Sequence, residues 1–421
     1  MSNSYILSNS MSPSLNAIQT KSSAAADLSY KMMKSIGSNV SKQCREIAIA
    51  AAYGANVSAD LLKYGLVYNV YLKLNVTMNG GGQGDDAAKA LLSKSQEGAF
   101  VNLLRSVVLS SHSRVLERLD RMQIINYILE RATSDNAAIL GYTHFNPTGP
   151  FTGNTSFDVL IPLPFSFFSM SRNKDSNHLQ NLNISLDFAS NAQAAKNFTT
   201  AQDVPAQLTG AQTAARVTIN SGHLVMNYYE MDQASTKKMF EQNYQSPSGL
   251  VNQLYTTIYR EATHAATVAP NQLVNVNVNI NTKNVIVRSF IAVRHKDAAE
   301  NAFIPVDKIA VNLNGIEYYA KSTDEIAFEK ILTSDHYNRM IKAATNSADY
   351  LELYVFDFRL VNIDAATKFT GGLSAKNVSN PEYVLTLNST SANIEVEVVH
   401  EVLNIVQISK ADGSMQSVLS V

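Results

Sequence analysis

The glycine-rich stretch at residues 79–86 (NGGGQGDD) is a first place where residue types and spacing could do chemistry. Glycine-rich loops bind phosphate when they end in Gly-Lys-Ser/Thr, because the lysine and the hydroxyl complete the phosphate and metal contacts. This stretch lacks that ending. Asp85 and Asp86 could hold a hard cation, but two adjacent acids without further ligands are usually solvated. We therefore interpret the stretch as an exposed turn.

The histidines and serines do not combine into a catalytic or metal-binding pattern. None of the eight histidines forms His-x-x-x-His or stands at zinc-ligand spacing from a cysteine. Ser374, in Gly-Gly-Leu-Ser-Ala, lacks the trailing glycine of a nucleophile elbow. His223 and His400 lie among strand residues, and we interpret both as structural. We expect no catalytic, cofactor-binding or metal site, which favours a structural protein over an enzyme.

Composition narrows the class of protein further. The 421 residues suggest two domains, and 45% hydrophobic with 16% charged residues is typical of folded protein. A net charge of −1 disfavours nucleic-acid binding by the folded body, because phosphate backbones attract a positive field. Cys44 is the only cysteine, which excludes an intrachain disulfide and fits assembly in a reducing cytoplasm. With no secretory-signal pattern and no apolar stretch of membrane-spanning length, we expect a soluble protein.

Alternation of apolar and polar side chains predicts β-strands through most of the chain. Residues 70–77 (VYLKLNVT) have the period of two that marks a half-buried strand, and residues 274–281 (VNVNVNIN) show it most cleanly. Further strands are expected at residues 103–109, 156–168, 182–188, 216–229, 285–293, 308–313, 351–360, 383–387 and 394–408.

Three segments depart from this alternation. After the Ser/Asn-rich residues 1–23, the alanine-rich residues 24–64 have helix-like apolar spacing and predict a helical N-terminal arm. Asp120 is placed to cap a short helix in a loop. Ser246 begins a third helical pattern, whose apolar stripe covers residues 250–258. We interpret this last segment as a helical connector between two domains.

The two halves of the chain repeat one another. In each half a strand leads through a polar turn into a short helix, and the second helix begins with a capping box of Ser322 and Glu325. The segments beginning at His223 and His400 also match, each inside a final strand. A shift of 204 residues places Val107, Leu109, Asp120, Met122, Ile124 and Ile128 on Val311, Leu313, Asp324, Ile326, Phe328 and Leu332.

The repeat predicts an all-β fold of two tandem eight-stranded sandwiches, with a helical N-terminal arm and short helices in loops. We expect the arm to lie beneath neighbouring subunits and to contact them. The alternative, that the arm packs on the first sandwich of its own chain as ordinary structure, stays open. The expected parts are an arm at residues 1–65, a first sandwich at 66–232, a helical connector at 233–269, a second sandwich at 270–410 and a tail at 411–421.

Pro162 and Pro164 interrupt the segment 156–168. Proline cannot donate a ladder hydrogen bond, so this segment should lie at a strand end or a sheet edge. Phe165, Phe167 and Phe168 follow at once. We expect their rings at a boundary between sandwiches or subunits; the alternative is a local core cluster within the first sandwich.

Three stretches together carry a resemblance to a known family. Residues 157–168 (FDVLIPLPFSFF) form a Pro-rich aromatic segment, Gly371-Gly-Leu373 and Asn380-Pro381 lead into the strand 383–387, and residues 398–405 (VVHEVLNI) look like a final strand. Over roughly residues 66–410 the chain resembles the double jelly-roll major capsid proteins of tailless icosahedral viruses. That lineage includes tectivirus-like phages, adenoviruses and the large DNA viruses of eukaryotes.

The resemblance implies a non-enzymatic capsid subunit of the virion, assembled in the host cytoplasm. Such subunits form homotrimers of pseudo-hexagonal outline that tile an icosahedral shell. The implied partners are neighbouring trimers, penton and minor capsid proteins and, through the arm, an internal membrane or the genome, with no small-molecule substrate. The alternatives are a receptor- or carbohydrate-binding β-sandwich protein (a spike or adhesin) and a glycoside-active enzyme. The absence of tryptophan disfavours the first, and no motif supports the second.

Overall fold

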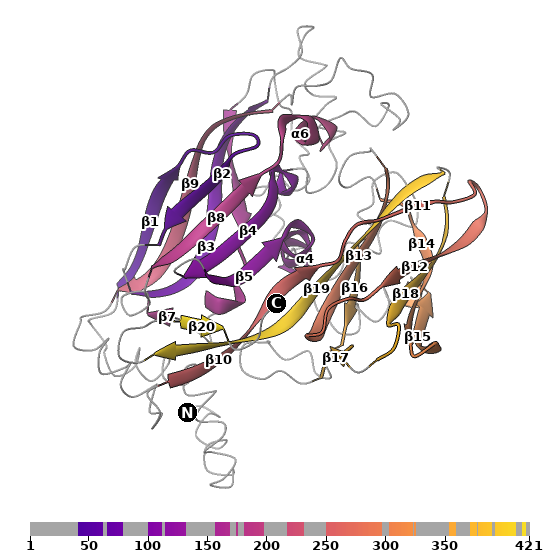
Figure 1. Ribbon diagram of the computed structural model, residues 1–421. Helices are drawn as coiled ribbons and strands as arrows, with labels where there is room; N and C mark the ends of the chain where they lie inside the picture. The colour runs from indigo at the N-terminus through magenta and orange to yellow at the C-terminus, as the bar shows by residue number, and fades with distance from the viewer. Residues whose placement is uncertain are drawn as a thin grey trace, which may run out of the picture.

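The computed structural model places two β-sandwiches side by side, the first built from the N-terminal half of the chain and the second from the C-terminal half (Figure 1). No α-helix in the described ranges is long and apolar enough to cross a membrane. The structure describes residues 41–61, 65–78, 100–111, 114–131, 156–168, 174–175, 181–197, 217–230, 250–296, 303–322, 324–325, 353–358, 371–376, 378–389, 392–409 and 415–417.

The first sandwich consists of two antiparallel sheets. One has the strand order β1-β9-β3-β6, with the short β7 (Lys174–Asp175) beside β3, and the other has the order β2-β8-β4-β5. Its eight principal strands are β1 (Ser41–Ile49), β2 (Asn56–Asp60), β3 (Leu66–Met78), β4 (Leu104–Ser111), β5 (Arg114–Asp120), β6 (Ser156–Pro162), β8 (Leu182–Phe188) and β9 (Val217–Glu230).

The second sandwich also consists of two antiparallel sheets, ordered β10-β19-β13-β16 and β12-β18-β14-β15. The short strands β11 (His264–Thr267) and β20 (Met415–Ser417) pair with β19, and β17 (Leu373–Ser374) pairs with β13. The eight principal strands are β10 (Leu250–Arg260), β12 (Leu273–Asn279), β13 (Val285–His295), β14 (Val306–Leu313), β15 (Ile316–Ser322), β16 (Tyr354–Asp357), β18 (Glu382–Asn388) and β19 (Asn393–Ser409).

The two sandwiches have the same topology. If the eight principal strands of each are numbered in chain order, both have one sheet ordered 1-8-3-6 and one ordered 2-7-4-5. Val107 and Val311, which the shift of 204 superimposes, both lie on the fourth strand of their sandwich, and His223 and His400 both lie on the eighth. Eight strands in two such sheets form a jelly roll. The predicted repeat of two eight-stranded sandwiches is therefore confirmed.

A short helix, α4, follows the fifth strand of the first sandwich, as predicted. In the second sandwich only residues 324 and 325 of the predicted helix are described, and both are helical. The Met122 N–H donates to Asp120 Oδ1 over 2.9 Å, and α4 begins directly after this cap. Ser322 and Glu325 form the expected capping box, with hydrogen bonds of 2.8 and 3.3 Å. The helices described are α4 (Arg121–Arg131), α6 (Asn191–Asn197), and the 3-10 turns η1 (Val101–Leu103) and η3 (Ser166–Phe168).

Two segments predicted to be helical are strands where the structure describes them. Residues 41–49 and 56–60, assigned to the helical arm, are β1 and β2, and residues 250–258, assigned to the helical connector, lie in β10. β1 and β10 are the first strands of their sandwiches, and each pairs with the last strand, β9 or β19. Part of the predicted tail is likewise a strand, β20. Residues 1–40 and 233–249 lie outside the described residues.

Environment explains why alternation is missing from β1 and β10. Most side chains of β1 are exposed on both faces of the strand, so its sequence does not alternate between apolar and polar residues. In β10 the four successive residues 255–258 are all buried, so apolar side chains point to both faces. A strand with both faces alike resembles an alanine-rich or apolar helix in its local pattern.

The pairing of β1 and β2 predicts the result of truncation. Deleting residues 1–60 removes an edge strand from each sheet of the first jelly roll, and exposes the ladder of β9 and the side chains packed beneath it. We expect insoluble or unfolded protein, whereas deleting residues 1–40 keeps every described strand and should yield soluble, β-rich protein. Soluble yield and circular dichroism measure both. A native-like protein lacking residues 1–60 would show that β1 and β2 are dispensable.

Candidate functional site at the contact between the sandwiches

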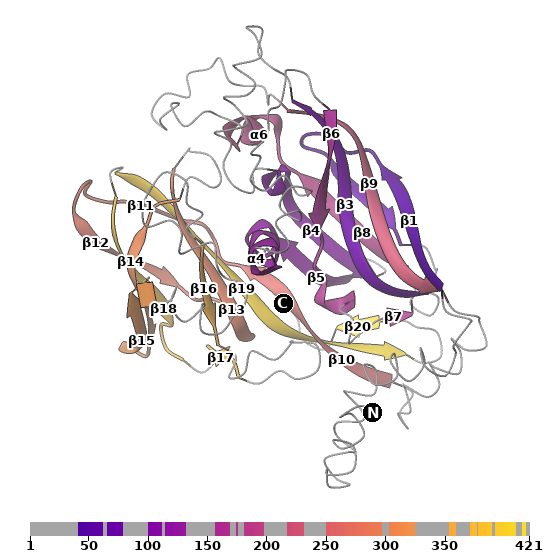
Figure 2. The ribbon, with the colours of Figure 1, turned by 180° about the vertical axis from the view of Figure 1, so that it is seen from behind.

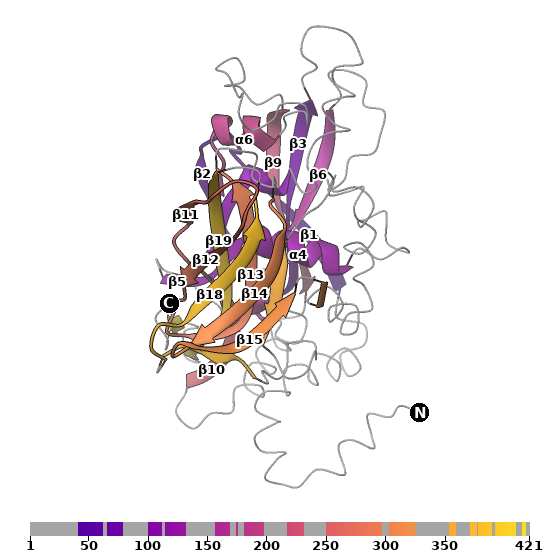
Figure 3. The same cartoon turned by 90° about the vertical axis from the view of Figure 1, so that its right-hand side faces the viewer.

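The sheet β10-β19-β13-β16 is buried on both faces. Val396 and Val398 of β19 belong to the core of the second sandwich, whereas Val399 of the same strand and Phe290 of β13 pack into the core of the first. The strand β5 and the turn η3 of the first sandwich contact β10 (Figure 1 and Figure 2). Viewed from the side, the second sandwich lies in front of the first (Figure 3). We call this contact between the two sandwiches the junction.

The Pro-rich aromatic segment lies at the junction. Pro162 ends β6, an edge strand of its sheet, as predicted. Phe165, Phe167 and Phe168 are all buried, and the Phe167 ring lies edge-on to the ring of Tyr255 in β10, with centroids 5.9 Å apart. The predicted packing at a boundary between sandwiches is confirmed for the Phe167 ring. The Phe165 and Phe168 rings lie edge-on to one another, and Phe168 also lies edge-on to Phe167.

Hydrogen bonds between a side chain and the backbone also join η3 to β10. The Ser166 hydroxyl donates to the Thr256 carbonyl over 2.8 Å and accepts from the Thr256 N–H over 3.0 Å. Nearby, the Tyr255 hydroxyl donates to the carbonyl of Leu116 in β5 over 2.6 Å and accepts from Asn404 Nδ2 over 2.8 Å. These hydroxyl, carbonyl and amide groups are thus satisfied although they are buried, which avoids the cost of leaving them unpaired.

Glu117 of β5 is a fully buried acid at the junction. Its two carboxylate oxygens accept the N–H groups of Ser166 and Phe167 over 2.7 and 2.8 Å. Burial raises the pKa of Glu117 to about 8, and the charge of Glu401 acts in the same direction. Glu401 itself accepts from Thr256 Oγ1 over 2.7 Å and from Arg288 Nε over 2.6 Å. Two acids therefore lie inside the junction, one of them with an arginine partner.

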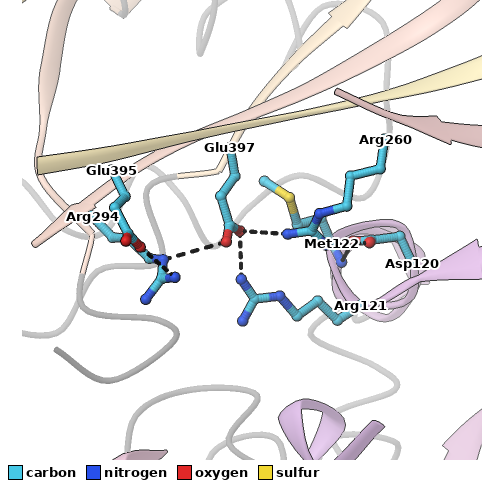
Figure 4. Close-up of polar contacts among 7 residues, drawn as sticks. All are labelled: Asp120, Arg121, Met122, Arg260, Arg294, Glu395 and Glu397. Atoms are coloured by element: carbon cyan, nitrogen blue, oxygen red, sulfur yellow. Dashed lines mark hydrogen bonds and ion pairs between the residues drawn. The ribbon is translucent and has the colours of Figure 1, made fainter. Parts of the chain in front are cut away.

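Glu397 of β19 is the centre of an ion-pair network across the junction (Figure 4). Its carboxylate hydrogen-bonds to Arg121 of α4, and lies 3.1 Å from Arg260 Nη2 and 3.4 Å from Arg294 Nε. Arg260 also pairs with Asp120 over 2.6 Å. Burial alone would raise the pKa of Glu397, but the three guanidinium groups lower it to about 2. The carboxylate is therefore charged at neutral pH and links α4 of the first sandwich to three strands of the second.

His400 lies in a buried hydrogen-bonded chain within the second core. Its Nδ1 is 2.8 Å from the Ser289 hydroxyl, which accepts from the Tyr383 hydroxyl over 2.7 Å. On the other side, His400 Nε2 is 3.4 Å from Glu261 Oε1. These residue types match those of a Ser-His-acid triad, but Ser289 and His400 are 0% exposed, so a substrate cannot reach them. The burial of His400 agrees with its interpretation as a structural histidine, and that interpretation stays a prediction.

The other residues considered from sequence do not gather into a site. His223 is half-buried on β9, Ser374 is exposed on β17 and Cys44 is exposed on β1, each on a different strand. Residues 79–86, with Asp85 and Asp86, lie outside the described residues. In the ranges that the structure describes, His, Cys, Asp and Glu side chains form no group of three that could hold a metal ion. The expectation of no metal site stays a prediction.

The junction acids were not identified from sequence, although a signal existed. The longest apolar strand pattern, residues 394–408, contains three acids: Glu395, Glu397 and Glu401. In an ordinary half-buried strand, acids at these positions would lie on the face exposed to solvent. Buried carboxylates need partners. Those partners, Arg121 and Arg260, come from segments far away in the chain.

Comparison with known proteins identifies the architecture. No family model and no curated protein matches the sequence. Among solved structures, the capsid of the virus PBCV-1 matches with a TM-score of 0.65 at 12% identity, over 91% of this chain and 98% of that chain. The chain has the double jelly-roll fold. The major capsid proteins of Faustovirus and mavirus match with TM-scores of 0.57 and 0.53, at 9% and 10% identity. The matches cover 87% and 90% of this chain, and 90% of each of theirs.

Glu397→Gln tests whether the ion-pair network holds the double jelly roll together. The substitution leaves three guanidinium groups without their shared carboxylate, and breaking a buried ion pair in this way costs about 3–5 kcal/mol. We expect a loss of that order in the free energy of unfolding at pH 7, measured by chemical denaturation. Because the folded pKa of Glu397 is about 2, against an ordinary 4.5, its stabilisation is present above pH 4.5 and is lost towards pH 2. The variant should lack this acid-dependent loss.

The matched control for that experiment is Glu317→Gln. Glu317 pairs with Lys308 over 3.4 Å, and the Glu317 side chain is 54% exposed. An exposed pair contributes at most about 1 kcal/mol. Equal losses in the two variants would contradict a special role for the buried network.

Glu117 should make the stability of the double jelly roll depend on pH in a second, separate range. Its folded pKa of about 8 exceeds the ordinary 4.5, so its stabilisation is fully present below pH 4.5 and is lost as the pH rises to 8. We expect Glu117→Gln to flatten the fall in unfolding free energy between pH 5 and pH 8. Glu46→Gln, at a half-exposed strand position, is the control. If the unfolding free energy of Glu117→Gln falls with pH as steeply as that of the parent protein, the pH dependence does not come from Glu117.

Proposed function

We propose that this protein is a viral major capsid protein, a structural subunit of the virion shell. The observation that carries the proposal is the pair of jelly rolls with identical strand order, fixed side by side in one chain. The structures of the same fold are capsid proteins, and they match over most of both chains. A shell subunit needs a rigid body of defined shape rather than a reactive site, and the buried junction supplies that rigidity.

The two jelly rolls of one chain suggest how the shell is tiled. Three copies around a threefold axis would place six similar sandwiches in a ring, which gives a trimer a pseudo-hexagonal outline. Such a trimer can pack against neighbours in six directions. We propose that homotrimers of this kind tile an icosahedral capsid.

The remaining partners follow from this role. We propose neighbouring trimers, penton and minor capsid proteins as partners, with assembly in the host cytoplasm. Residues 1–40, which carry Lys31 and Lys34, are proposed to contact an internal membrane or the genome. The capsid role is favoured over a receptor- or carbohydrate-binding sandwich because the structures that share the fold are capsid proteins. A catalytic role is disfavoured by the burial of the His400 chain.

A candidate contact between subunits is the hairpin of β14 and β15. Its turn, Asn314-Gly315, has positive φ at both residues, which suits a tight two-residue hairpin. Ile316 and Tyr318 beyond the turn are 70% and 73% exposed. Exposed large apolar side chains on a protruding element favour contact with another protein. We propose that this hairpin packs against the next copy in the trimer.

Particle size and shape test the proposed function. Three copies of the 46.0 kDa chain give a trimer of about 138 kDa. We expect light scattering on the purified protein to give this mass or larger assemblies, and negative-stain images to show hexagonal outlines or closed shells. A stable monomer at micromolar concentration would refute the capsid proposal.

Ile316→Ser combined with Tyr318→Ser tests the hairpin contact. Removing the two apolar side chains should shift the mass towards the monomer without changing the circular dichroism. Leu273→Ser is the matched control, because Leu273 is 66% exposed on β12, at the opposite edge of the same sheet. A double variant that remains as trimeric as the control would exclude the hairpin from the interface.

A further inference from the structure

A groove runs between the two jelly rolls beside the junction. Its volume is about 580 Å³, within the range of small-molecule sites. One wall is the outer surface of β4, β5 and β8 of the first jelly roll, and the other is the end of β10 and neighbouring parts of the second. Polar groups from both jelly rolls therefore face one shared, partly open groove.

Arginine side chains dominate the charge of this groove. Five arginines line it, against the three acids Asp120, Asp187 and Glu397. Three of the arginines belong to the network around Glu397 (Figure 4). The other two, Arg105 and Arg118, are exposed, and their guanidinium groups pair with no acid among the described residues. In a chain with a net charge of −1, this local surplus of positive charge is unusual.

Asn102 supplies a second, independent observation. It lines the groove and is only 3% exposed, yet neither its Oδ1 nor its Nδ2 has a hydrogen-bond partner in the described structure. A buried amide without partners costs free energy, and most such groups in proteins are satisfied. An unsatisfied amide beside two arginines that have no acidic partner among the described residues points to a polar ligand that completes their hydrogen bonds.

We propose that this groove binds an anion carrying two or more phosphate or carboxylate groups. Arg105 and Arg118 would grip separate anionic groups, because a guanidinium donates two parallel hydrogen bonds to such oxygens. Asn102 Nδ2 would donate a further hydrogen bond. The negative charge of Asp187 would repel the anion, so binding requires more arginines than acids in the groove. Because both jelly rolls line the groove, the bound anion would stabilise the folded chain and its junction. The inference does not depend on the proposed capsid role.

Calorimetric titration of the full chain tests the proposal, with tripolyphosphate as the phosphate probe and citrate as the carboxylate probe. We expect saturable binding of at least one probe and a higher midpoint of thermal unfolding in its presence. Tighter binding of tripolyphosphate would assign the site to phosphates, and tighter binding of citrate to carboxylates. Failure of both probes to bind at millimolar concentration would overturn the proposal.

Arg105→Gln combined with Arg118→Gln locates the site. Each charge-assisted pair contributes on the order of tenfold in affinity, so the double variant should bind at least about tenfold more weakly. Arg114→Gln is the matched control, because Arg114 is exposed on the same strand as Arg118 but does not line the groove. Unchanged affinity in the double variant, or an equal loss in the control, would overturn the proposal.

Asn102→Leu separates binding from folding, since its two effects have opposite signs. Replacing an unsatisfied buried amide with an apolar group of similar shape should raise the unfolding midpoint of the ligand-free protein. It should also weaken anion binding by severalfold. A variant that binds the anion as tightly as the parent chain would contradict the role of Asn102 and with it the proposed site.

Discussion

Burial of the sheet β10-β19-β13-β16 on both faces is the constraint on which this structure depends. A sheet covered on one side only can leave its charged residues in water, but here the outer face meets the first jelly roll. Acids buried on either side of this contact must then find partners or lose their charge. Glu397 keeps its charge among three arginines, whereas Glu117 accepts two backbone N–H groups and has its pKa raised by burial. The two responses to burial occur within a single interface.

The same topology serves unlike environments in the two halves of the chain. β1 and β10 occupy equivalent positions, but β1 is mostly exposed whereas β10 is buried at residues 255–258. The first strand of the second sandwich can therefore carry Tyr255 and Thr256 as contacts to the first sandwich. The two copies of the fold form a single body because the sheet β10-β19-β13-β16 of the second sandwich packs against the first sandwich.

A rigid pair of sandwiches is a suitable unit for a shell. Charge pairs and hydrogen bonds have directional geometry, so the junction fixes orientation as well as contact. Apolar packing by Phe167 and Val399 adds stability without the same directional requirement. In the proposed capsid role, assembly would use surfaces away from the junction, such as the β14–β15 hairpin, and would leave the shape of the subunit unchanged.

Most strands, the repeat and the edge position of Pro162 could be predicted from the amino-acid sequence. These features have local causes: apolar alternation marks a half-buried strand such as β8, and proline lacks a ladder donor wherever it stands. The strands β1 and β10 could not be predicted in this way, because their partners β9 and β19 lie far along the chain and their own patterns do not alternate. The ion-pair network at the junction could not be predicted for the same reason, because it joins residues that lie far apart in the chain. Arg121 and Glu397 are separated by 276 residues, and no local pattern can indicate which buried acid will meet which arginine.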